Sequence, residues 1–295
     1  MAVTGIERAR LRPLSSAQSS IWFAQMLDPH SPVYNIGEYL EIVGPIDPQL
    51  FETALRQVVA QCDALRLRVI ETDEGPRQYI GADPDWSMPF VDVSGEADPC
   101  AFAETWMHED MARVVDLTRG PLFGYALFRG ATNRFFWYAR YHHICNDGFG
   151  FSLVARRQAA VYSALFRAKR LETGNLGSWF DLLDEEDDYR LSARYVHDRE
   201  YWHDQLAQRP EPATLSGKPL ARSGRFIRWT GHLTRPVVDA LRAFRGAYEA
   251  SLAQVVTTAA ALYLHRLTGA DDLILGMPVT GRSGARIACH GGHGF

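Results

Sequence analysis

Two adjacent histidines, His142 and His143, are followed, after three intervening residues, by Asp147 and Gly148. An imidazole with its ordinary pKa of about 6.5 is largely neutral near pH 7, so it can accept a proton from an attacking amine or hold that amine in place. Positioned acid–base catalysis of this kind typically contributes roughly 10² to 10⁴ in rate. The run therefore predicts a site for proton transfer, and acyl transfer is a reaction that such a site suits.

The residues next to the histidines suggest supporting roles. Consecutive strand side chains point to opposite faces, so we expect one histidine to face a cleft and the other to pack behind it. Asp147 can orient a histidine, or it can brace the loop through a salt bridge. Gly148 and Gly150 permit a close backbone approach or a positive φ, and a backbone N–H at the helix start can face a developing oxyanion.

Other interpretations of the run stay open. A His-His pair can be purely structural. A metal site would need more ligands than the pair and Cys145, because catalytic zinc normally has three protein ligands, and we expect no metal. Cys145 is close enough to His143 to act as a nucleophile, but it follows an apolar isoleucine, which favours a buried and inert thiol.

The surrounding segments alternate between strand and helix patterns. An aromatic-rich strand over 134–141 is expected to end at the histidines, and a helix over 151–167 follows the glycines. Upstream, the patterns predict helices over 15–26, 48–62 and 98–114 and strands over 38–42, 65–70, 78–80 and 122–128. Downstream, they predict helices over 189–206, 236–248 and 251–267, strands over 226–233 and 273–276, and a solvated helix start at the acidic stretch 184–188. The mixture predicts an α/β sandwich with a seam near residue 175.

Composition narrows the class of protein. The chain has 295 residues, a formal net charge of −4 and ordinary globular composition. A nucleic-acid binder would show a basic patch or stripe, and the scattered Lys and Arg residues form none in the sequence. The first residues lack a signal-peptide pattern, no apolar run is long enough for a membrane span, and the four cysteines are widely spaced. These features predict a cytoplasmic protein.

Five short motifs, in order across nearly the whole chain, resemble those of the condensation domains of nonribosomal peptide synthetases. HHICNDG at 142–148 matches the HHxxxDG core signature of that family, and PLSSAQSSIW at 13–22 is similar to its opening SxAQxRLW motif. QCDALRLRV at 61–69 resembles RHExLRTxF. YWHDQL at 201–206 and LGMPVTGR at 275–282 are similar to YWxxQL and GxPVxGR. The stretch around the histidines looks most like the condensation domains of enterobactin-type siderophore synthetases.

The resemblance implies a pseudo-dimer of two chloramphenicol-acetyltransferase-like lobes, each an α/β sandwich, with a tunnel between them. Donor and acceptor, each a thioester on the phosphopantetheine arm of a peptidyl or acyl carrier protein, would enter from opposite faces. The acceptor amine would attack the donor thioester and form an amide bond. The partners implied are carrier proteins, with no nucleic acid and no membrane, and the only cofactor implied is the phosphopantetheine that the carriers supply.

The same resemblance implies roles for the residues of the core signature. His143 is the expected functional histidine, as base or positioning group, and His142 is mainly structural. Gly148 would place a backbone N–H near the reacting thioester.

Asp147 is expected, again by resemblance, to form a salt bridge to an arginine and not to touch substrate. Gln61 stands where the family has the first arginine of its second motif. Arg66 or Arg68 is therefore expected to replace that arginine as the partner of Asp147.

The end of the chain departs from the family pattern. Family members continue well past the GxPVxGR segment, so we expect a first lobe over 10–174, an incomplete, C-terminally truncated second lobe over 175–282, and a disordered tail over 283–295. Exposed apolar surface on 225–282 and low solubility would follow. Two alternatives to amide formation between carriers are a CoA-dependent acyltransferase of the same superfamily and an inactive fragment that only binds carrier protein.

Overall fold

The computed structural model describes residues 11–170, 176–210, 213–215 and 231–277. Contacts divide the chain into two compact units, the first reaching Arg190 and the second beginning at Leu191. No helix in these described ranges is both long and apolar enough to cross a membrane. The seam expected at 174–175, most of the strand expected over 226–233, the last five residues of the GxPVxGR segment and the tail 283–295 lie outside the described residues.

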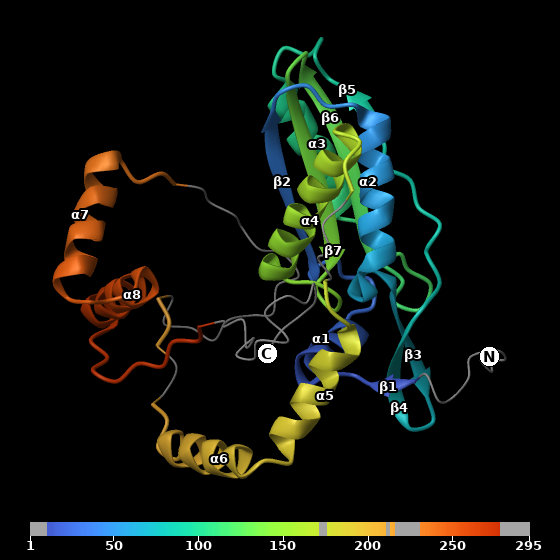
Figure 1. The fold of residues 1–295 in the computed structure, drawn as a ribbon. Coiled ribbons are helices and arrows are strands. Elements are labelled where there is room, and N and C mark those ends of the chain that lie inside the picture. Colours follow the sequence, from blue (N-terminus) through green and yellow to red (C-terminus); the bar gives the residue numbers. More distant parts are fainter. Residues whose placement is uncertain (1–10, 171–175, 211–212, 216–230, 278–295) are drawn as a thin grey trace. The chain divides into compact units, whose positions relative to one another are not determined.

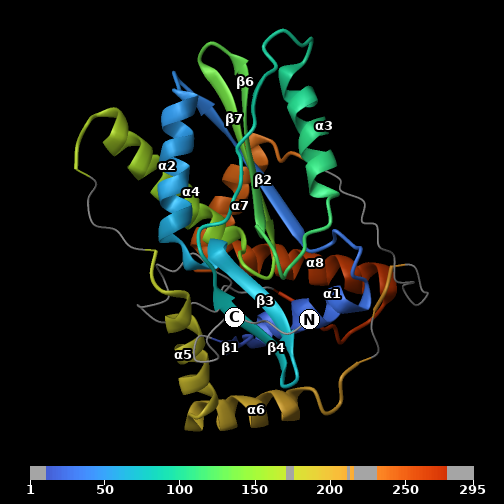
Figure 2. The same ribbon diagram turned by 90° about the vertical axis from the view of Figure 1, so that its right-hand side faces the viewer.

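The first unit is built on a four-stranded sheet. Its strands lie in the order β2, β7, β6, β5, and all pairs are antiparallel except β5 with β6. The strands are β2 (Asn35–Val43), β5 (Phe90–Asp92), β6 (Phe123–Ala131) and β7 (Arg134–His142). Helices α2 (Pro48–Gln61) and α4 (Gly148–Phe166) cover one face, and α3 (Pro99–Met111) covers the other (Figures 1 and 2). The α/β sandwich expected from the sequence is confirmed in this unit.

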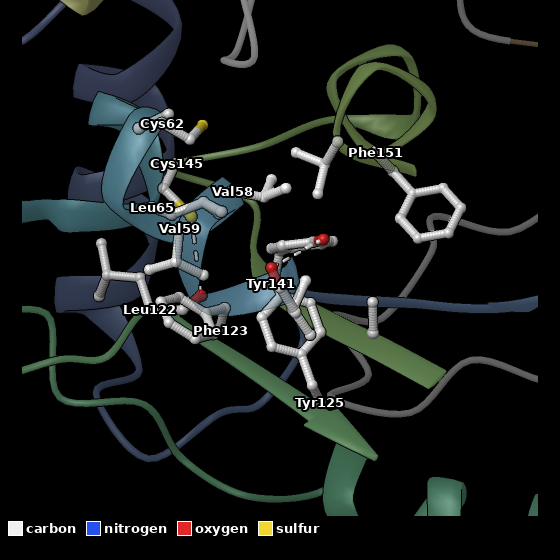
Figure 3. Close-up of a cluster of buried hydrophobic side chains, with 14 of the residues drawn as sticks. Val58, Val59, Cys62, Leu65, Leu122, Phe123, Tyr125, Tyr141, Cys145 and Phe151 are labelled. Carbon is white, nitrogen blue, oxygen red and sulfur yellow. Dashed lines mark hydrogen bonds between the residues drawn. The ribbon is translucent and has the colours of Figure 1, made fainter. Parts of the chain in front are cut away.

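The aromatic residues of β7 fill both sides of this sheet. Trp137 and Tyr141 belong to the core on the side of α2 and α4, whereas Phe136 and Tyr138 belong to the smaller core beneath α3. Side chains alternate between faces along a strand, so a run without polar residues is what a doubly covered strand requires. Figure 3 shows the larger core where Tyr141 meets Leu65 and Val58.

A second, three-stranded sheet has the order β1, β4, β3. Its strands are β1 (Arg12–Pro13), β3 (Leu67–Thr72) and β4 (Gly75–Ile80). Helix α1 (Ser16–Leu27) starts at a capping box, in which Ser15 and Gln18 each accept the backbone N–H of the other. This is the pairing that a serine followed three residues later by a glutamine favours.

Helix α5 (Trp179–Arg190) shows that one prediction was wrong. The acidic stretch 184–188 lies in the second half of the helix, and it is not simply solvated. Glu186 is buried and accepts hydrogen bonds from the backbone N–H (3.0 Å) and hydroxyl (2.5 Å) of Ser16. Asp184 pairs with Arg12 at 2.5 Å. The stretch therefore attaches α5 to the start of α1.

Several element bounds also differ from the predictions. The helix expected over 189–206 is divided, because Ser192 accepts the N–H of Tyr195 and so starts a new helix, α6 (Ala193–Gln205). The strand expected from residue 65 begins at Leu67, since Asp63–Arg66 form a 3-10 turn. Helix α4 begins at Gly148, three residues earlier than expected.

The second unit contains α6, α7 (Arg235–Ala247) and α8 (Leu252–Thr268). None of these helices has a buried residue, and large apolar side chains on α7 and α8 are exposed. The strand expected over 273–276 is not formed: residues 273–277 have no regular structure. A strand is stabilised by a pairing partner, and none of the strands described pairs with this segment. The exposed apolar surface expected here is present, and low solubility stays a prediction.

Candidate active site

The two histidines lie where β7 ends against its neighbours. His142 is opposite Asn35 in the register of β2 and β7, and its backbone N–H donates to the carbonyl of Leu122 at 2.8 Å. The N–H of His143 donates to the carbonyl of Tyr34 at 2.7 Å. The chain then turns, and the N–H of Cys145 returns to the carbonyl of His142 at 3.0 Å. We refer to residues 142–146 as the histidine turn.

The ring of His143 has a defined orientation. It is half-buried, and its Nδ1 lies 3.1 Å from the backbone carbonyl oxygen of Asn146. A carbonyl oxygen only accepts hydrogen bonds, so in the neutral ring Nδ1 carries the proton and Nε2 carries the basic lone pair. The turn itself therefore selects the tautomer that a base acting through Nε2 requires.

His142 differs from His143 in its burial and in its hydrogen bonds. Only 2% of its surface is exposed, its Nδ1 accepts the N–H of Ile144 at 3.2 Å, and its Nε2 lies 3.2 Å from Oε1 of Gln25. Burial, together with the positive charges that His143 and Arg140 can carry, lowers the pKa of His142 to about 4. A histidine that stays neutral and is enclosed on all sides suits a structural role.

Asp147 and Gly150 shape the start of α4. The Asp147 carboxylate caps the helix by accepting the N–H of Gly150 at 2.6 Å. Gly150 has a helical backbone and no positive φ, but a Cβ there would lie 1.9 Å from Oδ1 of Asn146. Close approach, and not an unusual backbone angle, is what requires this glycine.

Gly148 is in a different position from Gly150. It is exposed at the first turn of α4, where helix N–H groups have no partner within the helix. A Cβ at Gly148 would meet only the carboxylate of Glu38, at 3.7 Å, which is an ordinary contact distance. Partial burial raises the pKa of Glu38. Sequence reasoning missed Glu38, because an acidic residue in an alternating strand pattern gives no sign that it lies beside this helix start.

The arginines expected to pair with Asp147 have other contacts. Arg66 forms an ion pair with Asp63 at 2.8 Å and lies 3.9 Å from Asp83. Arg68 is buried and donates from Nη1 to the carbonyl of Leu67 at 2.7 Å, and burial lowers its pKa. A salt bridge between Asp147 and either arginine stays a prediction.

Gln61, which stands where the family has an arginine, connects two helices. Gln61, at the end of α2, accepts a hydrogen bond from Nε of Arg157 on α4 at 2.9 Å. The amide therefore contributes to the contact between the two helices that cover the sheet. The sequence had no signal for this contact, because it joins residues far apart in the chain.

Cys145 is an unsuitable nucleophile. Its thiol is fully buried in the core shown in Figure 3 and donates to the carbonyls of His142 (3.2 Å) and Leu122 (3.6 Å). Burial raises the pKa of the thiol well above its ordinary value, so the thiolate is disfavoured. Across the described ranges, His, Cys, Asp and Glu side chains form no group of three that could hold a metal ion.

The arrangement places a basic imidazole nitrogen and a helix N-terminus at the two ends of one short loop. Such a pair can accept a proton from a nucleophile and stabilise negative charge on a carbonyl oxygen. These are the two requirements of acyl transfer without a covalent enzyme intermediate.

Comparison with known proteins identifies relatives of the whole chain. The family model for the condensation domain matches residues 9–293. A dimodular nonribosomal peptide synthase of Bacillus subtilis (strain 168) is 43% identical over 272 residues, which are 92% of this chain and 11% of the synthase. Enterobactin synthase component F of Escherichia coli O157:H7 is 33% identical over 211 residues, 71% of this chain and 16% of that protein.

A solved structure shows the same fold. The starter condensation domain of rhizomide synthetase RzmA, a mutant in complex with C8-CoA and Leu-SNAC, superposes with a TM-score of 0.87 at 42% sequence identity. The match covers 97% of this chain and 64% of the solved chain. The chain thus spans less than two thirds of the solved domain and a small fraction of the curated synthases. The chloramphenicol-acetyltransferase-like α/β class and the resemblance to enterobactin-type synthetases are confirmed.

Proposed function

The chain belongs to the condensation-domain family, and from this premise we propose that it forms an amide bond between a thioester donor and an amine acceptor in nonribosomal peptide synthesis. Carrier proteins present both substrates on phosphopantetheine arms. The observation that carries this proposal is the orientation of His143, whose Nδ1 lies 3.1 Å from the carbonyl oxygen of Asn146 and leaves the lone pair on Nε2.

The reaction needs one proton transfer and no covalent enzyme intermediate. The acceptor nitrogen attacks the donor carbonyl carbon, and the nitrogen loses a proton to Nε2 of His143. The carbon–sulfur bond then breaks, and the protonated imidazole returns the proton to the departing thiolate. One amide and one free thiol result. Because the thioester is already activated, holding two tethered substrates together supplies much of the acceleration.

Gly148 contributes a backbone N–H that can stabilise the oxyanion formed from the donor carbonyl. Its backbone N–H belongs to the first turn of α4, where the helix dipole favours negative charge. The space beside Gly148, bounded by Glu38 at an ordinary contact distance, allows a thioester to approach the N–H closely.

The donor is an acyl group, as in a starter domain. The 42% identical relative is a starter condensation domain in complex with C8-CoA and Leu-SNAC, which supports a medium-length acyl donor and an aminoacyl acceptor. The likeness to enterobactin synthase component F supports a siderophore as a product class. We also propose that residues 10–174 form the lobe that contributes the histidine turn, that residues 175–282 belong to a second lobe, and that the reaction takes place in the cytoplasm.

A second candidate function is acyl transfer directly from coenzyme A. The same relative was solved in complex with C8-CoA, and this observation is the reason to test coenzyme A as a direct donor. The two functions differ in the donor alone, so one assay with two donors distinguishes them.

The test measures amide formation by mass spectrometry. Octanoyl-loaded carrier protein and octanoyl-CoA are supplied separately as donors, with leucyl-loaded carrier protein as the acceptor. We expect product from the carrier-bound donor, and His143→Ala is expected to lower its rate by about 10² to 10⁴.

His108→Ala is the matched control. His108 also places Nδ1 near a backbone carbonyl, that of Glu104 at 2.7 Å, but it is exposed on α3. This variant should keep the full rate. Amide formation by folded His143→Ala at the rate of the unchanged chain would rule out the role of His143, and product from octanoyl-CoA alone would favour the second function.

A further inference from the structure

Two buried glutamines of α1 contact the histidine turn. Gln18 and Gln25 have exposed fractions of 0% and 4%, and they are seven residues apart. Seven residues make about two helical turns, so both side chains lie on the same face of the helix. None of their described hydrogen bonds goes to Gly148, beside which the thioester is proposed to bind, and the proposed mechanism gives the two glutamines no part.

Gln25 determines the state of His142. Its Nε2 donates to the carbonyls of Asp28 (3.0 Å) and Ser31 (3.1 Å), which can only accept. Its Oε1 must therefore face Nε2 of His142, and that ring nitrogen must carry the proton. Nδ1 is then the acceptor that the N–H of Ile144 requires, at 3.2 Å.

Gln18 contacts the other side of the same peptide segment. Its Oε1 accepts the backbone N–H of Ser15 at 3.0 Å, so its Nε2 is the end that faces the turn. That Nε2 donates to the carbonyl of Ile144 at 3.1 Å. The orientation of this amide, like that of Gln25, follows from a backbone partner of fixed role.

Gln78 of β4 anchors this contact. The amides of Gln18 and Gln78 donate to each other at 3.0 and 2.8 Å. Gln78 also donates to the carbonyl of Pro13 and accepts from Nε1 of Trp179, each at 2.8 Å. Every donor and acceptor of both amides is satisfied, and a fully satisfied buried network is rigid.

Ile144, the residue after His143, is thus held at both of its backbone polar groups. Its N–H binds the ring that Gln25 orients, and its carbonyl binds Gln18. We propose that Gln18 and Gln25 are positioning residues that fix the histidine turn, and through it the ring of His143, for catalysis. The proposal rests on the proposed function for its catalytic part, whereas the geometry of the turn can be tested separately.

The experiment compares three size-matched variants: Gln18→Met, Gln25→Met and Gln158→Met. Gln158 is the control, because it is also a buried glutamine with one described hydrogen bond, to the carbonyl of Phe51 at 2.9 Å, and it makes no described contact with the turn. Thermal denaturation establishes the temperature range in which all three are folded. The kinetic assay is the amide-forming reaction described above, at saturating and limiting carrier concentrations.

We expect Gln18→Met and Gln25→Met to lower kcat by about 10²-fold, since small misplacements of reacting groups have effects of this size. The KM for both carriers should stay within about threefold, because the proposal gives neither glutamine a contact with substrate. Gln158→Met should keep its kcat. Equal losses of kcat in all three variants, or full kcat in the two α1 variants, would overturn the proposal.

A spectroscopic measurement tests the turn without any activity. Imidazole nitrogen NMR of the 295-residue chain should show the Nε2–H tautomer for His142. Gln25→Glu places a carboxylate against that nitrogen and should raise the pKa of His142 by about 1 to 3 pH units, whereas Gln158→Glu should not. An unchanged pKa of His142 in Gln25→Glu would show that the contact is absent. If the unchanged chain forms no amide but these shifts appear, the proposed function fails and the contact stands.

Discussion

At the scale of single residues, the two glycines that open α4 have different reasons to be glycine. A Cβ at Gly150 would lie 1.9 Å from Oδ1 of Asn146, whereas one at Gly148 would meet only Glu38 at 3.7 Å. The packing of the protein thus requires glycine at position 150. At position 148 it does not, so a requirement for glycine there would come from the reaction.

Gly150→Ala is therefore expected to destabilise the first unit by roughly 1 to 3 kcal/mol, the usual effect of overpacking. Gly148→Ala should unfold at the same urea concentration as the unchanged chain or slightly higher, because alanine favours helix more than glycine does. Its rate of amide formation should fall about tenfold or more, because a methyl group would occupy the approach of the thioester. Urea denaturation and the carrier assay measure the two effects.

Each variant serves as the control for the other. A full rate for Gly148→Ala would mean that the thioester does not approach α4 from this side. Unchanged stability of Gly150→Ala would mean that the side chain of Asn146 can move aside.

At the scale of elements, the start of α4 depends on Asp147. Its carboxylate accepts the N–H of Gly150, and an asparagine oxygen at the same place can do so too. Asp147→Ala is expected to lower the free energy of unfolding by about 1 kcal/mol, and Asp147→Asn by less than half of that. Asp98 caps α3 in the same way, with N–H groups of Cys100 and Ala101 at 3.0 Å, and is exposed far along the chain from the turn.

The pair Asp98→Ala and Asp98→Asn calibrates the loss of a cap alone. If Asp147→Asn proves as destabilising as Asp147→Ala while the two Asp98 variants differ, the charge of Asp147 matters more than its cap. That outcome would support the salt bridge expected from the sequence and contradict the present prediction.

Patterns among neighbouring residues predicted the helices and strands around the site well. Contacts between residues far apart in the chain could not be predicted from such patterns. The start of α2 at Pro48 and the strand that ends at the histidines both follow from neighbouring residues. The buried role of Glu186 was missed, because its partner Ser16 is 170 residues away. The role of Gln18 was missed for the same reason, since Ile144 is 126 residues away and a helix surface glutamine has the same local pattern as a buried one.

At the scale of the whole molecule, the second unit presents apolar side chains that its own helices do not cover. Phe244 on α7 and Leu262 on α8 are both more than half exposed. Exposed apolar side chains on neighbouring helices can bind hydrophobic dyes and favour association. We expect the 295-residue chain, studied alone at pH 7, to bind the dye ANS while its near-ultraviolet circular dichroism remains that of a folded protein.

Phe244→Gln and Leu262→Gln together should lower ANS fluorescence and leave the unfolding midpoint of the first unit unchanged. Val43→Thr is the control, because Val43 is a strongly exposed residue of β2 in the first unit. If ANS binding persists in the double variant, or near-ultraviolet signal is absent throughout, the dye reports a loosely packed core instead of these helices.

The contacts of α1 with the histidine turn also set a condition for building chimaeric synthetases. Gln18 and Gln25 lie more than a hundred residues before the turn that they hold, and Gln78 lies between them and it. A crossover anywhere between residues 26 and 141 takes Gln18 and Gln25 from one parent and the histidines from the other. Exchanges that keep this pairing intact must therefore either leave residues 18–146 undivided or choose parents that share the same three glutamines.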